Sequence, residues 1–223
     1  MPIDPKILEK LDKGREFRAI PLAGIELRED KGSNEMIAEG YATTYNQPYV
    51  LFEDGNYKVV EEIDSRAFDK CDMSDVVFLV NHTGRVPART KNGTLQLRSD
   101  SHGLHQRSSL GGTQYGQQVF EEIKGGYMDT MSMSFVVAKD ERTVTEDLEN
   151  NKYTVHRKIT EIKKLYDVSV VTFPANPATE ISARSVGEGV IAEAREQLQL
   201  LQAEINNRQS KREEIRSLLE GKK

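Results

Sequence analysis

An alternation of apolar and hydroxyl side chains within residues 127–137 constrains the fold of this chain most. Ser132 and Ser134 are each flanked by apolar residues. The apolar members of the alternation stand at every second position: Met131, Met133, Phe135 and Val137. Because successive side chains of a β-strand point to opposite faces, this period of two predicts a strand that presents both serines on one face. A hydroxyl on a strand is held in a defined position, so both serines are candidate functional groups.

Most of residues 37–173 carries similar strand signals. Segments rich in β-branched and aromatic residues predict strands at 37–45, 59–63, 76–80 and 165–173. The run at 76–80 is apolar throughout, which is typical of a strand buried on both faces. The pattern therefore predicts a mainly β fold with short helices (an α+β chain) and a barrel-like core.

Two hairpins are expected between these strands. Asn92-Gly93 predicts a tight turn that joins 86–91 to 94–98. The polar stretches 140–151 and 153–162 resemble the arms of a second hairpin.

Short helices are expected at 65–68 and 118–123. A Ser or Asp residue precedes the first and can cap it, and Gly125-Gly126 is a stop signal for the second.

Composition divides the chain into three parts. We expect residues 1–22 to form a flexible or helical arm and residues 23–185 to form the folded core. Residues 186–223 begin with a glycine-containing linker and continue with a stretch, 191–220, that has no Gly or Pro. Apolar residues recur there at an imperfect heptad spacing, which predicts a helix that packs on a partner.

The bulk properties exclude several classes of protein. The net charge of −5 argues against general nucleic-acid binding. No apolar run approaches the roughly 20 residues of a membrane span, so no membrane partner is expected. We expect no secretory signal in residues 1–6, and a single cysteine, Cys71, forms no internal disulfide and suits a reducing compartment.

A serine needs an adjacent base to become a nucleophile at neutral pH, and the base needs a group that holds its tautomer. His82 is the candidate base, because it stands where the apolar strand 76–80 ends. Two interpretations stay open from spacing alone. His82 is either a catalytic base or part of a polar turn, and Ser132 and Ser134 are either reactive or the solvated face of a strand.

Asp167 is the candidate for the third group, because a carboxylate inside an apolar strand needs a partner. The alternative is a solvated aspartate paired with Lys163 or Lys164. Glu161 is the reserve candidate, since it shares a face with Asp167 if one strand runs through both.

The other three histidines are weaker candidates. His102 and His105 have a spacing of three that can suit a metal pair, but no further ligand set is nearby and a surface location is favoured. His156 stands in a charged strand and is expected to be solvated. No metal or cofactor is therefore expected.

Three segments, in order, carry a family resemblance. They are Asn81-His82, the Met-Ser-x-x-Phe run from Met131 to Phe135, and the block from Leu165 to Pro177. Together they resemble the prohead maturation proteases of tailed bacteriophages, serine peptidases related in fold to the herpesvirus assemblins. Supporting segments are 39–42, 63–68 and 103–104, and the resemblance covers about residues 37–180.

The resemblance implies a closed, herpesvirus-protease-like β-barrel core followed by a C-terminal helix. It also implies Ser132 as nucleophile, His82 as base and Asp167 at a usually acidic position. The phage pattern has Gly where this chain has Ser134, so both serines are candidates, and Ser132 is favoured because it directly follows Met131. The herpesvirus relatives use a second histidine, which the matching strand at 165–173 lacks.

The implied role is that of a serine endopeptidase inside the procapsid, in the host cytoplasm. Its expected partners are the major capsid protein and the scaffold region of that protein, which it would cut before cutting itself. The tail, 186–223, would bind scaffold or be removed by self-cleavage. A homodimer is a further possible partner state.

Two alternatives come from other classes of protein. One is a non-enzymatic capsid assembly or scaffolding protein that uses its tail as a rod. The other is a hydrolase of small esters, against which the lack of a Gly-x-Ser-x-Gly motif counts.

Overall fold

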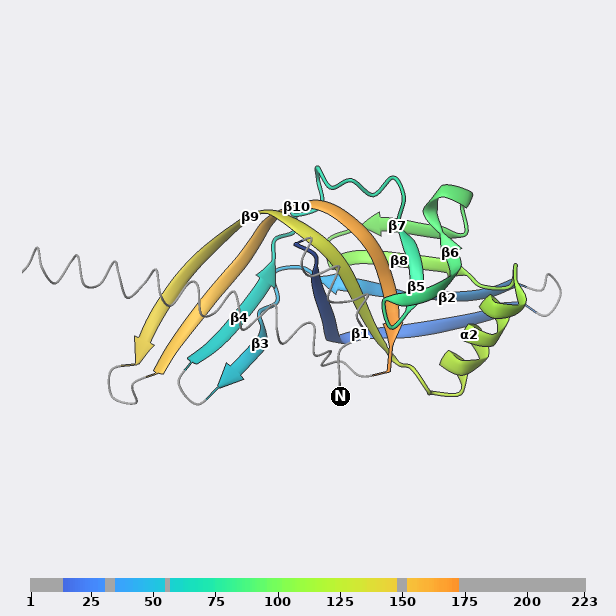
Figure 1. Ribbon diagram of the computed structural model, residues 1–223, viewed down its shortest axis with the longest axis horizontal. Coiled ribbons are helices and arrows are strands. Elements are labelled where there is room, and N and C mark those ends of the chain that lie inside the picture. The colour runs from blue at the N-terminus through green and yellow to red at the C-terminus, as the bar shows by residue number, and fades with distance from the viewer. Residues whose placement is uncertain (1–13, 31–34, 55–56, 148–151, 173–223) are drawn as a thin grey trace, which may run out of the picture.

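The computed structural model describes residues 14–30, 35–54, 57–147 and 152–172, which form a mainly β fold (Figure 1). The strands are β1 (Glu16–Asp30), β2 (Glu35–Thr44), β3 (Tyr49–Asp54), β4 (Tyr57–Ile63), β5 (Val77–Val80), β6 (Thr83–Arg89), β7 (Leu95–Ser99), β8 (Gly103–Ser109), β9 (Thr130–Asp147) and β10 (Lys152–Val171). The helical elements of the described residues are η1 (Thr90–Asn92), a 3-10 turn, and α2 (Gln114–Lys124). The prediction of a mainly β chain is confirmed.

A long antiparallel pair, β9 and β10, organises the sheet. The two strands have 18 and 20 residues and arch across the molecule (Figure 1). Their ladder contains several register shifts, which increase twist and let long strands bend. The first half of β10 pairs in parallel with β4, and the second half pairs in parallel with β5. The end of β5 therefore lies beside the part of β10 that faces the serines of β9.

The predicted closure into a barrel is not found in the described residues. The strand order runs β3-β4-β10-β9-β1-β2-β8-β7, with β5 and β6 attached to β10 as a side branch. The path thus begins at β3 and ends at β7, and no ladder of the described strands joins these ends. The side branch does not close the sheet either, since β6 pairs with β5 alone and not with β7.

The turn at Asn92-Gly93 exists, but the hairpin predicted around it is wrong. Gly93 has a φ of 77°, as the turn signal requires. However, β6 pairs with β5, and β7 pairs with β8. The η1 turn redirects the chain between β6 and β7, and each of these strands pairs instead with its other neighbour in the sequence, β5 or β8.

The two predicted short helices have different outcomes. The second is α2, which begins after Thr113, whose side chain accepts a hydrogen bond from the Gly116 amide at 2.9 Å. The first is a series of turns instead: Ala67 and Asp69 donate to carbonyls three residues earlier, at 3.0 and 3.1 Å. No described helix has the length and apolar composition to cross a membrane.

The core lies against the β9–β10 pair. Met131, Met133 and Phe135 are fully buried, as the alternation predicted. They pack in one cluster with residues of α2 and β10: Val119, Phe120, Ile123, Val168 and Val170. The tail, 186–223, and residues 1–13 of the N-terminal arm predicted at 1–22 lie outside the described residues.

Candidate active site

The two serines of β9 face two polar residues of β10 across the antiparallel ladder. Ser132 is opposite Ser169, and Ser134 is opposite Asp167. All four side chains are at most 1% exposed. The interpretation of the serines as a solvated face is therefore wrong, because their hydroxyl groups are buried against His82 and Asp167.

His82 reaches this face from the turn that follows β5. Asn81, His82 and Gly84 all have positive φ, at 50°, 59° and 85°. Such conformations are uncommon for residues other than glycine, and they persist where the surrounding structure holds them. Asn81 supplies that hold, since its amide donates to the Val170 carbonyl at 3.0 Å and its side chain bonds Thr172.

A continuous hydrogen-bond chain links the three predicted residues. The Nε2 atom of His82 lies 2.7 Å from Ser132 Oγ, and Nδ1 lies 2.6 Å from Asp167 Oδ1. With a proton on Nδ1, the imidazole donates to Asp167 and can accept the serine proton at Nε2. This arrangement has the geometry of a nucleophile, a base and a group that orients the base.

The other two serines hold the Asp167 carboxylate. Ser169 donates to Oδ1 at 2.6 Å, and Ser134 donates to Oδ2. Ser169 Oγ also lies 3.1 Å from His82 Nδ1. Burial by itself raises the pKa of Asp167, but the attraction of His82 and the hydrogen bonds from His82, Ser134 and Ser169 together lower that pKa below its usual value. The carboxylate is therefore kept ionised beside the histidine.

A family model described as the caudovirus prohead serine protease matches residues 23–190. The chain belongs to this family. It is therefore a serine peptidase of phage capsid assembly and maturation. No curated protein matches the chain. Among solved structures, the capsid assembly protease gp21 of bacteriophage T4 is similar, with 12% identity, a TM-score of 0.39, and coverage of 70% of this chain and 95% of that one.

In this prohead protease, Glu161, the reserve candidate for the orienting acid, and Lys164, a candidate partner of Asp167, have other partners. Glu161 contacts Lys139 at 3.2 Å and Lys70 at 3.8 Å. Lys164 binds Asp72 at 2.6 Å, so it does not neutralise Asp167. Register shifts in the β9–β10 ladder separate Glu161 from Asp167, which is why simple alternation misplaced the reserve candidate.

The other histidines have neighbours of a different kind. The rings of His102 and His105 pack edge-on against Tyr41, with centroids 4.5 and 5.2 Å away. His156 lines a surface pocket described below. Within the described residues, no group of three or more His, Cys, Asp or Glu side chains is arranged to hold a metal ion.

A buried ionic cluster that no sequence pattern indicated lies next to the serine strand. Glu61 of β4 accepts from Arg18 of β1 at 2.5 and 2.9 Å and from Arg157 of β10 at 2.9 Å. Both arginines also bind Glu16, and Tyr49 donates to Glu61 at 2.5 Å. No local pattern could have revealed this cluster, because its members come from strands that are far apart in the sequence.

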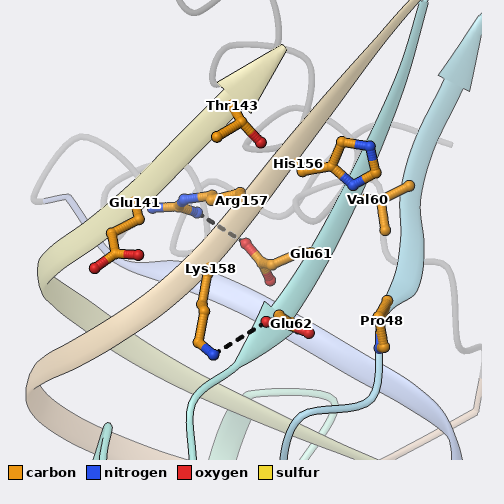
Figure 2. Close-up of a pocket in the computed structure, with 9 residues that line it drawn as sticks. All are labelled: Pro48, Val60, Glu61, Glu62, Glu141, Thr143, His156, Arg157 and Lys158. Atoms are coloured by element: carbon orange, nitrogen blue, oxygen red, sulfur yellow. Dashed lines mark hydrogen bonds and ion pairs between the residues drawn. The ribbon is translucent and has the colours of Figure 1, made fainter. Parts of the chain in front are cut away.

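A pocket of about 280 Å³ lies beside this cluster. Figure 2 shows the residues that line it. In it, Arg157 points toward Glu61, and Lys158 points toward Glu62. The lining residues are Pro48, Val60, Glu61, Glu62, Glu141, Thr143, His156, Arg157 and Lys158. None of the three residues of the hydrogen-bond chain lines this pocket, so it is separate from the candidate active site.

Proposed function

We propose that this chain is an endopeptidase that cuts the scaffold region of the phage major capsid protein, and itself, during procapsid maturation. The observation that carries the proposal is the hydrogen-bond chain from Asp167 through His82 to Ser132. Membership of the prohead protease family supports the class of substrate. The tail, 186–223, is proposed to bind scaffold or to be removed by self-cleavage, inside the procapsid.

The proposed reaction proceeds through an acyl-enzyme. Ser132 Oγ attacks the scissile carbonyl while His82 Nε2 takes the hydroxyl proton. The tetrahedral intermediate collapses, and His82 returns that proton to the leaving amine. A water molecule then attacks the ester with His82 again as base, which frees the acid product and restores Ser132. Asp167 keeps Nδ1 protonated throughout, and Ser134 and Ser169 keep the carboxylate in place.

The test is co-expression of the full chain with its capsid protein, followed by mass spectrometry of both. We expect Ser132→Ala to slow cleavage by about 10⁴-fold or more, because the nucleophile is lost. Ser134→Ala removes only a hydrogen bond to Asp167, so its cleavage products should stay abundant.

The outcome also decides between the two serines. If Ser134→Ala is inactive while Ser132→Ala still cuts, Ser134 is the nucleophile. If Ser132→Ala is folded and processes the capsid protein normally, the proposed chemistry is wrong. The family model that matches the chain describes a serine protease, so it gives no support to the non-enzymatic alternative.

A further inference from the structure

Strand β1 is divided into two halves with different partners. Residues 16–20 and, beyond a break, Gly24 pair with β9, and residues 25–30 pair with β2. A register shift between Ile20 and Gly24 separates the halves. The family match begins only at residue 23. We call residues 14–20 the arm; it can leave β9 without breaking the β1–β2 ladder.

The arm covers the candidate active site. Ala19 lies opposite Ser132 in the ladder, and Phe17 lies opposite Ser134. The Phe17 ring packs edge-on against the His82 imidazole, with centroids 4.8 Å apart. Ser132 is 1% exposed and His82 is fully buried. A peptide bond therefore has no access to the serine while the arm is in place.

The arm also competes for the proton of the nucleophile. Ser132 Oγ donates to the Arg18 carbonyl at 2.9 Å, while His82 Nε2 lies 2.7 Å away. A hydroxyl has one proton, and a carbonyl can only accept. When that proton points to Arg18, it does not point to His82. The backbone of the arm thus holds the proton that the base has to remove.

An ionic anchor keeps the arm in place. The Arg18 guanidinium is fully buried against Glu61. Burial by itself lowers the pKa of Arg18, but its attraction to Glu61 and Glu16 and its hydrogen bond to Glu61 together raise that pKa above its usual value. Arg157 also holds the arm, through Glu16 at 2.6 Å, but it contacts Glu61 at 2.9 Å as well and would keep that carboxylate paired after the arm leaves. Since removal of one partner is most costly when it strands a buried charge, this second arginine lowers the cost of releasing the arm.

We infer that the arm is autoinhibitory and occupies the place of the substrate, an extended peptide that pairs antiparallel with β9 over residues 130–135. This inference rests on the proposed protease activity. Strand addition to a sheet edge is a common mode of peptide recognition, in which main-chain hydrogen bonds give the affinity. The register of the arm indicates that a peptide carbonyl of the substrate is presented to Ser132 where the Arg18 carbonyl lies.

The test measures the rate at which a fluorophosphonate probe labels the full chain. Arg18→Glu places a carboxylate beside Glu16 and Glu61, which should release the arm and raise the rate at least tenfold over wild type. The matched control is Arg28→Glu, on the same strand beyond the register shift, where the side chain is 72% exposed. Its rate should equal that of wild type. In the Arg18→Glu variant, a peptide of residues 14–20 should suppress labelling, and the same peptide with Glu at position 18 should not.

The controls separate this inference from the protease assignment. If wild type is labelled as fast as a folded Arg18→Glu variant, and Ser132→Ala removes the label, the protease stands and the arm inference fails. If no folded variant is labelled at Ser132, the protease assignment itself fails. Arg18→Gln covers the case in which Arg18→Glu does not fold, as judged by circular dichroism. It adds no charge, and labelling no faster than wild type would overturn the inference.

Discussion

At the scale of single residues, Asp167 determines what His82 can do. Its carboxylate lies 2.6 Å from Nδ1 and holds the ring with Nε2 toward Ser132. Asp167→Asn preserves the shape but can present an amide donor to Nδ1, which favours the wrong tautomer. We expect cleavage of the capsid protein to slow by about 10³- to 10⁴-fold, as measured by timed mass spectrometry.

Glu161→Gln is the matched control for that change. The Glu161 carboxylate contacts Lys139 and Lys70 near the surface, and such pairs contribute little to stability. Cleavage by this variant should stay within about twofold of wild type. Should Glu161→Gln be inactive and Asp167→Asn active, the assignment of the orienting acid is wrong.

At the scale of elements, the buried cluster joins β1, β4 and β10. Glu61 is fully buried and is the common acceptor of Arg18 and Arg157. Glu61→Ala removes the carboxylate that the two buried guanidinium groups share, so each has less negative charge beside it. The free energy of unfolding, from urea titration, should fall by about 3–5 kcal/mol.

The comparison variant is Glu62→Ala, one residue along β4. The Glu62 side chain is partly exposed and binds Lys158 at 3.3 Å. Its loss should cost no more than about 1 kcal/mol. Equal destabilisation by the two variants would show that the cluster has no special weight in holding these strands together.

At the scale of the whole molecule, buried carboxylates link stability to pH. Burial raises the pKa of Glu16, but the attraction of Arg18, the hydrogen bond from Arg157 and the other arginine contacts outweigh it, and the pKa is about 2 against 4.5 for a free side chain. The unfolded chain binds this proton first as pH falls, so the stabilisation is complete above about pH 4.5 and is lost toward pH 2. The difference corresponds to about 3 kcal/mol, and the lowered pKa of Asp167 acts in the same direction.

Urea titrations at pH 7, 4.5 and 3 measure this dependence. Wild type should lose stability steadily below pH 4.5, and Glu16→Gln should flatten the curve. Glu53→Gln, at an exposed position of β3, should leave its slope unchanged. A wild-type urea midpoint that is the same at pH 4.5 and at pH 3 would contradict the account.

Much of the fold and the core of the site could be predicted from local patterns. Met131, Met133 and Phe135 of β9 are buried as their alternation predicted, and the strand predicted at 165–173 exists up to Val171 as the end of β10. The pairing of 86–91 with 94–98 was wrong because a turn signal gives the place where a chain reverses but not the strand that it then joins.

Local patterns were enough for the strands at 37–44, 59–63 and 77–80, the shared face of Ser132 and Ser134, and the family resemblance, because each depends on neighbouring residues or on ordered motifs. The contacts between distant strands came from the tertiary structure: His82 reaches Ser132, Asp167 and not Glu161 meets the histidine, and the arm lies against Ser132 and His82. These contacts depend on the parallel register of β5 and β10, on the register shifts of the β9–β10 ladder and on the division of β1. Strand register is set by packing between distant segments, which a local period of two cannot encode.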